Sequence, residues 1–74
     1  MSHGDPDHDR VRAALREADP EGPLTAREVL ALCREHGVEL GSAHRVATVL
    51  GRWAESGDAV TVIRSDPYRY EFDL

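Results

Sequence analysis

The sequence predicts a mainly α fold with a small antiparallel β-hairpin, an α+β domain in which three helices precede two strands. Two observations predict it. Apolar residues recur with the spacing of amphipathic helices as far as residue 57, and after Gly57-Asp58 they alternate as in a strand. A chain of 74 residues has the size of one domain. We therefore expect a disordered N-terminus over residues 1–5 and a single domain over residues 6–74.

The first helix is expected from about residue 6 to 18. Asp5-Pro6 predicts its beginning, because Asp is a preferred N-cap and Pro is favoured at the first helical position. The next residues place one apolar stripe on the helix, and the loop DPEGP (19–23) ends it with two prolines and a glycine. The stripe consists of Val11, Ala14, Leu15 and Ala18.

Leu24 stands alone between this loop and the second helix, where it can dock as a one-bridge strand. Thr25-Ala26-Arg27-Glu28 has the pattern of a capping box and predicts that the second helix begins at about residue 26. Gly37 is a natural left-handed terminator. The expected inner face consists of Ala26, Val29, Leu30 and Cys33.

Ser42 is the expected N-cap of the third helix (about 43–56), and Gly57 is its expected end. At 100° per residue, the side chains of this helix fall on two opposite faces. The predicted buried side holds Ala43, Val46, Ala47, Leu50, Trp53 and Ala54, and the predicted outer side holds His44, Arg45, Thr48, Gly51, Arg52 and Glu55.

The strands of the hairpin are expected at 59–64 and 68–73, since both runs are rich in β-branched and aromatic residues. The turn cluster Ser65-Asp66-Pro67 separates them. Tyr68, Tyr70 and Phe72 alternate along the second run. Such a face could stack single-stranded bases, but we expect it to cover the helical core.

The chain is acidic, with a net charge of −5, and all nine of its basic residues are Arg. This sign is unusual for a nucleic-acid-binding protein. The charge is unevenly placed, because residues 1–39 carry five Arg and nine acidic residues, whereas residues 40–70 carry four Arg and three acidic residues. The acid-rich, lysine-free composition also fits a salt-loving host, in which screening would weaken the repulsion between the acids and a phosphate backbone.

The stretch TAREVLALCREHGVELGSAHRVATVLGRWAESGDAVTVIRSDPYRYEF resembles the winged helix-turn-helix domain of small prokaryotic transcription regulators. Its third helix matches a serine-led pattern at Ser42, Arg45, Val46, Leu50, Trp53 and Gly57. The resemblance implies a three-helix core plus a wing, with helix 43–56 in the major groove of DNA and the wing 59–73 on the backbone. The groove-facing residues that it implies are Ser42, His44, Arg45, Thr48 and Arg52, and the implied phosphate contacts of the wing are Arg64 and Arg69.

Other sites receive less support from the sequence. Cys33 and His36 lie three residues apart, but Cys33 belongs to the predicted buried stripe and no orienting group is apparent, so we expect no enzyme. The N-terminal His3 and His8 stand among Asp residues at a spacing that fits no closed zinc site, so we expect no metal and no cofactor.

The sequence thus predicts a DNA-binding protein, a transcription regulator whose partner is double-stranded DNA. The alternative is a winged-helix protein–protein interaction module that binds a partner through its acidic first-helix side. A homodimer, with the first helix at its interface, stays open. A single cysteine and the lack of a long apolar run indicate a cytoplasmic protein that does not enter a membrane.

Overall fold

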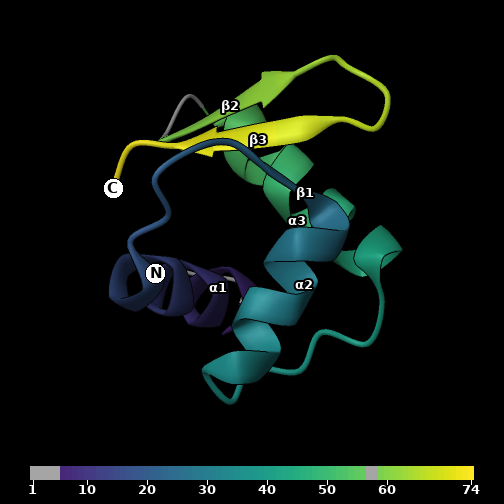
Figure 1. Cartoon of the computed structure of the whole chain (residues 1–74). Helices are drawn as coiled ribbons and strands as arrows, with labels where there is room; N and C mark the ends of the chain where they lie inside the picture. The colour runs from purple at the N-terminus through teal and green to yellow at the C-terminus, as the bar shows by residue number, and fades with distance from the viewer. Residues whose placement is uncertain (1–5, 57–58) are drawn as a thin grey trace.

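A computed structural model describes residues 6–56 and 59–74 of the chain. The predicted disordered N-terminus, the Asp5 cap and the Gly57 terminator lie outside the described residues. Within the described ranges, three helices and three short strands follow one another (Figure 1). The elements are α1 (Pro6–Ala18), β1 (Leu24–Thr25), α2 (Ala26–Glu35), α3 (Ala43–Glu55), β2 (Val60–Ile63) and β3 (Arg69–Phe72).

The predicted fold class is confirmed. The three strands form an antiparallel sheet in the order β1-β3-β2, and the β2–β3 hairpin crosses α3 while α1 and α2 lie toward the other end of the molecule (Figure 1). Leu24 pairs with Tyr70, and Thr25 pairs with Arg69. This layout is consistent with that of a winged helix, and we use the name wing for the β2–β3 hairpin.

Side-chain caps fix the starts of the two helices that precede the wing. The backbone N–H of Thr25 donates to Glu28 Oε1 over 2.8 Å, and the N–H of Glu28 donates to Thr25 Oγ1 over 3.2 Å, which completes the predicted capping box of α2. The N–H of Arg45 donates to Ser42 Oγ over 3.1 Å and so caps α3. Gly37 ends α2 with φ +78°, as expected.

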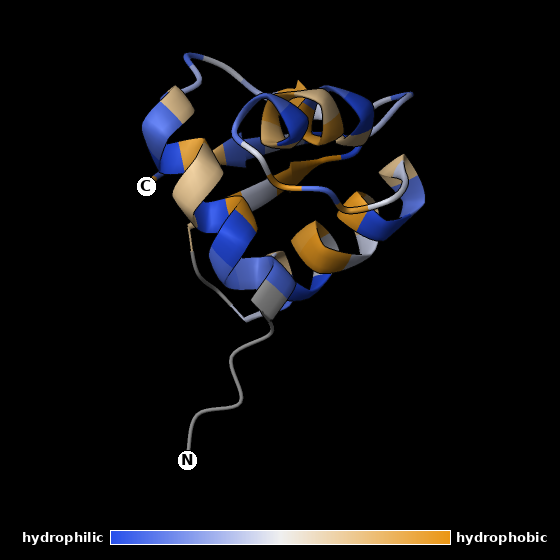
Figure 2. Cartoon of the chain, turned by 90° about the horizontal axis from the view of Figure 1, so that it is seen from below, coloured by the Kyte–Doolittle hydropathy of each residue, from blue (hydrophilic) through white to orange (hydrophobic). Residues whose placement is uncertain are grey.

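The core joins one stripe from each helix to the inner face of the sheet. Figure 2 shows hydrophobic segments of the elements turned toward one another and hydrophilic ones turned outward. Burial of this apolar area is the main favourable term for a chain of this size. The buried residues of the core cluster are Val11, Ala14, Leu15, Val29, Leu30, Cys33, Leu40, Val46, Leu50, Trp53, Val60 and Tyr70.

Two predictions about burial need correction. On α3 the buried stripe includes Val49, which the prediction left out, and Ala47 is only half-buried, whereas Ala43 and Ala54 are half-buried and pack against the core as predicted. The stripe is rotated because α3 packs against α1 and α2 with one side, while the side that carries the alanines opens toward the wing. Tyr68 does not cover the core, because it precedes β3 near the turn of the wing and stays 51% exposed.

Among the described residues, the sheet has an open edge at β2. The N–H of Asp73 donates to the carbonyl of Ala59 over 2.8 Å, which makes these two residues a hydrogen-bonded pair. Because such pairs alternate along an antiparallel ladder, Thr61 and Ile63 bond to β3, and the backbone groups of Val60 and Val62 face away from it. β2 therefore presents backbone donors and acceptors at the end of the sheet.

Candidate nucleic-acid interface

The outer face of α3 is polar and exposed, as predicted. Ser42, His44, Thr48 and Arg52 are all exposed on it. Thr48 Oγ1 donates to the carbonyl of His44 over 3.1 Å, so its hydroxyl lies close to the helix. Glu55 is also exposed, but it lies at the C-terminal end of the helix. The N-terminal half of this face therefore carries no carboxylate of its own.

Arg45 is held by the first turn of α1. Its Nη2 donates to Asp7 Oδ2 over 2.6 Å, and the two side chains keep 56% and 23% of their exposure. A short bond between a guanidinium and a carboxylate is a strong interaction in geometry, although exposure reduces its contribution to stability. Arg45 is thus on the surface that the sequence predicts, but its charge is shared with an acidic residue 38 positions earlier.

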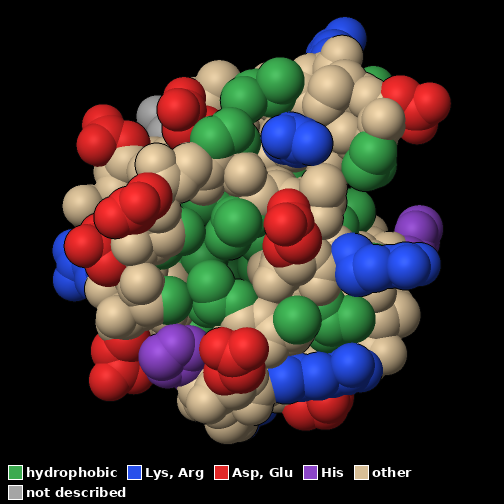
Figure 3. Space-filling model, viewed as in Figure 1, with side chains coloured by type: hydrophobic (Ala, Val, Ile, Leu, Met, Phe, Trp, Pro, Cys, Tyr) green, Lys and Arg blue, Asp and Glu red, His purple; other side chains and the backbone are tan. Residues whose placement is uncertain are grey.

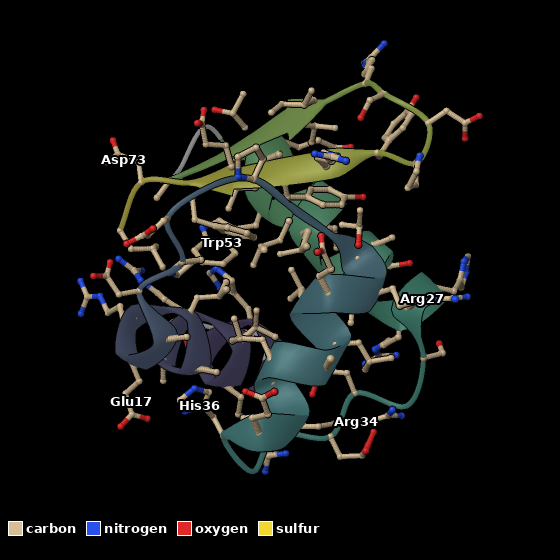
Figure 4. All side chains as sticks on the ribbon, in the orientation of Figure 1. Glu17, Arg27, Arg34, His36, Trp53 and Asp73 are labelled. Atoms are coloured by element: carbon tan, nitrogen blue, oxygen red, sulfur yellow. The ribbon has the colours of Figure 1, made fainter. Side chains whose placement is uncertain are left out.

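The residue after Asp7 makes a second contact with α3. The ring of His8 meets Trp53 edge-on, with the ring centres 4.5 Å apart. Trp53 is buried between the sheet and α1 (Figure 4), and it also lies 6.2 Å from the ring of Phe72. The buried Nε2 of His8 has no hydrogen-bond partner among the described residues. Two successive residues of α1 therefore fasten it to the helix that carries the candidate interface.

The wing contributes two arginines at different places. Arg64 follows β2, Arg69 begins β3, and both are exposed. At the tip, Ser65 Oγ donates to the carbonyl of Pro67 over 2.7 Å. The pKa of Glu28 lies below its ordinary value because Thr25 hydrogen-bonds to its carboxylate, and the charge of Arg69 acts in the same direction. The sheet register places Arg69 opposite Thr25, at the start of α2.

Charge is separated across the surface. Figure 3 shows acidic side chains gathered over α1 and the C-terminal end of β3, with arginines toward the opposite side of the same face. In Figure 4, Glu17 and Asp73 project on the α1 side, whereas Arg27 and Arg34 project on the other. Of the candidate interface, Arg45 meets this acidic side directly, through its contact with Asp7.

An open groove runs between α3 and β2. It has a volume of about 580 Å³, and small residues of α3 form its floor, namely Ala47, Gly51 and Ala54. Glu55 lies where α3 ends, and Arg64 lies where β2 ends. The sequence prediction missed this groove, because the helical repeat alone does not say which flank of α3 the wing leaves open.

Cys33 and His36 do not form a catalytic pair. Cys33 is fully buried, and burial raises the pKa of its thiol. His36 is at the end of α2, and its Nδ1 lies 3.7 Å from Glu17 Oε2. Across residues 6–56 and 59–74, no three His, Cys, Asp or Glu side chains come together as a set of metal ligands. In the same part of the chain, no helix has the length and apolar character required to cross a membrane.

Comparison with known proteins shows a partial similarity to an enzyme. A stretch of 56 residues is 39% identical to part of glycerol-3-phosphate dehydrogenase (NAD(P)+) from Parvibaculum lavamentivorans, and it covers 76% of this chain. The chain spans only 17% of the length of that enzyme. No family model matches the chain, and no solved structure matches it.

Proposed function

We propose that this chain is a winged helix-turn-helix protein that binds double-stranded DNA and regulates transcription. The observation that carries the proposal is the outer face of α3. This face is exposed and polar, begins at a capped N-terminus, and carries no carboxylate of its own over its N-terminal half. An α-helix of this kind fits the major groove, where short polar side chains and Arg hydrogen-bond to base edges.

In this proposal α3 enters the major groove from its N-terminal end. Ser42, His44 and Thr48 face the bases, and Arg52 contacts bases or phosphate further along the groove. The N-terminus of the helix adds a partial positive charge that favours a phosphate nearby. Arg64 and Arg69 bind the backbone from the wing. Arg45 reaches DNA only when its contact with Asp7 is exchanged for one with phosphate.

The number of available cations limits the affinity. Arg52, Arg64 and Arg69 are the proposed phosphate contacts outside the Asp7 ion pair. Each phosphate contact makes the slope of log K against log salt more negative by about 0.9. A monomer with so few contacts binds DNA weakly and is displaced readily by salt. The net charge of −5 acts in the same direction at low ionic strength.

We propose binding and no catalysis for this chain. The dehydrogenase resemblance extends over only 17% of that enzyme, and the described residues form three helices and a small antiparallel sheet, whereas a dinucleotide-binding fold is built on a mostly parallel sheet. The resemblance is better explained by a small module that can stand alone or occur within a longer polypeptide.

The test is a titration of the ¹⁵N-labelled protein with a random duplex at low salt. The proposal predicts shifts in the amides of residues 42–52 and 64–69. Replacing Arg52 with Ala should weaken binding and reduce the salt slope by about one unit. Arg16→Ala is the matched control, because Arg16 is an exposed arginine near the end of α1, on the acidic side.

Equal losses in Arg52→Ala and Arg16→Ala would mean that only overall charge matters, and the proposed interface would be wrong. An absence of shifts at millimolar duplex would exclude DNA binding.

A second candidate function rests on the acidic surface. The acids over α1 and the end of β3 form a separate face that a basic protein segment could bind (Figure 3). In this alternative the chain is a protein–protein interaction module that uses its α1 side. A basic peptide would then shift amides of residues 6–18, and duplex DNA would shift none.

A further inference from the structure

The open edge of β2 and the groove beside it suggest how two copies of the chain associate. We propose that β2 pairs antiparallel with β2 of a second copy, centred on Val62, so that two three-stranded sheets join into one. The two copies use the same surface, as a twofold dimer requires. The association is measured without nucleic acid, so its outcome does not depend on DNA binding.

The first argument is the hydrogen bonding of the edge. The backbone groups of Val60 and Val62 face away from β3, and β2 is the last strand of the sheet. Natural edge strands are usually protected by charged residues, proline or a covering segment. Val60–Ile63 contains none of these residues, and an open groove lies beside it. The edge is therefore available for another strand.

The second argument is the shape of the groove beside that edge. Val60 and Val62 point to the inner face of the sheet, toward α3. A strand added to the edge lies beside β2 along the open side of this groove, with its own Val60 and Val62 on the same face of the joined sheet. A Cβ atom placed on Gly51 would have no atom within 4 Å, so the groove is open at this position to the approach of the second copy.

The third argument selects a second copy of the chain as the occupant. The groove carries Glu55 at the end where β2 begins and Arg64 at the end where β2 stops. Antiparallel pairing reverses the direction of the second strand. Arg64 of the second copy then lies opposite Val60, on the side of Glu55, and the symmetric contact forms at the other end. A chain with a net charge of −5 meets its copy here through an uncharged strand and two opposite-charge contacts.

On the outer face, the same register brings Thr61 opposite Ile63 of the second copy. Both side chains are exposed, and Ile63 is one of the large hydrophobic residues that the described surface leaves open. Cross-strand pairs of this type stabilise a sheet. The pairing therefore covers an exposed apolar side chain in each copy.

The experiment measures mass by sedimentation over a range of concentrations, together with amide hydrogen exchange. We expect a monomer–dimer equilibrium in which the amides of Val60 and Val62 gain protection as concentration rises. The amides of Thr61 and Ile63 bond to β3 and should be protected throughout.

The blocking variant carries Thr61→Lys and Ile63→Lys, which places like charges across the new strand pair. It should be monomeric at concentrations where the parent is dimeric. Glu71→Lys is the matched control, because it makes the same change in net charge on the outer face of the central strand β3. It should keep the dimer.

Gly51→Met tests the groove separately. The substitution favours the helix and its Cβ meets no atom within 4 Å, so the fold should be retained while the longer side chain obstructs the groove beside the β2 edge. We expect at least a tenfold weaker dimer with unchanged circular dichroism. The proposal is overturned by a monomer at millimolar concentration, by a dimer that survives both variants, or by unprotected Val60 and Val62 amides in the dimer.

Discussion

The first and third helices can be compared directly, since α1 and α3 are both 13 residues long and both bury an apolar stripe in the same core. Their outer faces differ. α1 carries Asp7 and Asp9 in its first turn, whereas the first turn of α3 has no acidic residue. The inner stripe therefore determines the fold in both helices, and the difference in expected partners comes entirely from residues that the fold does not require.

The largest expected effect tests the part that the two helices share. Leu15 on α1 and Leu50 on α3 are both fully buried. Replacing either one with Ala should lower the free energy of unfolding by about 2–5 kcal/mol, because each change removes buried methyl groups and leaves a cavity. Urea denaturation measures the loss. If one helix tolerated the change with a loss below about 1 kcal/mol, the two helices would not share one core.

The next effect concerns the junction of the helices with the wing. Thr25→Ala removes the side-chain acceptor of the α2 cap and should cost about 1 kcal/mol in the free energy of unfolding. Thr25→Ser retains a hydroxyl at the same position and is the control. Thermal unfolding of both variants measures the difference, and equal melting temperatures would show that the cap contributes no stability.

A smaller effect tests the contact between α1 and the outer face of α3, where Asp7 binds Arg45. Asp7→Asn removes the carboxylate that holds Arg45, and the exposed ion pair should contribute at most about 1 kcal/mol to stability. If α3 binds DNA, the same variant should bind a duplex up to about fivefold more tightly, as the Asp7 carboxylate no longer competes with phosphate for Arg45. Fluorescence anisotropy of a labelled duplex measures the change.

Asp9→Asn is the control for Asp7→Asn, because it removes the same charge from an exposed position on the same helix. Equal gains in the two variants would show that net charge, and not the contact with Arg45, controls affinity.

The smallest expected effect is a loss of folding stability at alkaline pH, caused by Cys33 in the core that both helices share. Burial raises the pKa of Cys33, so the folded state keeps the thiol protonated where the unfolded chain has begun to ionise. The stabilisation is complete below the unfolded pKa of about 8.5 and is lost as pH rises from there through the folded pKa.

Unfolding free energies between neutral and alkaline pH should show this decline in the parent chain and less of it in Cys33→Ala. Tyr70, whose pKa burial also raises, adds a decline of the same sign at higher pH in both proteins. Identical slopes in the two proteins would contradict the contribution of Cys33.

The sequence alone predicts those helix ends and strand positions that depend on residues close together in the chain. The caps at Thr25 and Ser42 and the terminator at Gly37 act over a few residues, so the starts of α2 and α3 and the end of α2 follow from the sequence alone. The strand at Leu24 and the positions of β2 and β3 follow from the same kind of local pattern.

The missed features depend on the packing of elements that are distant in the sequence. Asp7 meets Arg45 only after α1 has packed across α3, and no local repeat relates positions 38 apart. Val49 is buried on the side of α3 that packs against α1 and α2, whereas the flank with Ala47 lines the open groove beside the wing. A helical wheel drawn for one helix shows neither of these packing effects. The proposed interfaces with DNA and with a second copy likewise remain predictions, since they involve molecules outside the chain.

The two-residue strand β1 has one more consequence. Thr25 pairs with Arg69 of the wing and is also the N-cap of α2. One residue therefore sets both the lateral position of the hairpin and the beginning of the helix pair, so a change in one displaces the other. A partner that contacts α3 and the hairpin together therefore meets a preorganised surface. Binding then loses less conformational entropy, because no flexible segment has to become ordered.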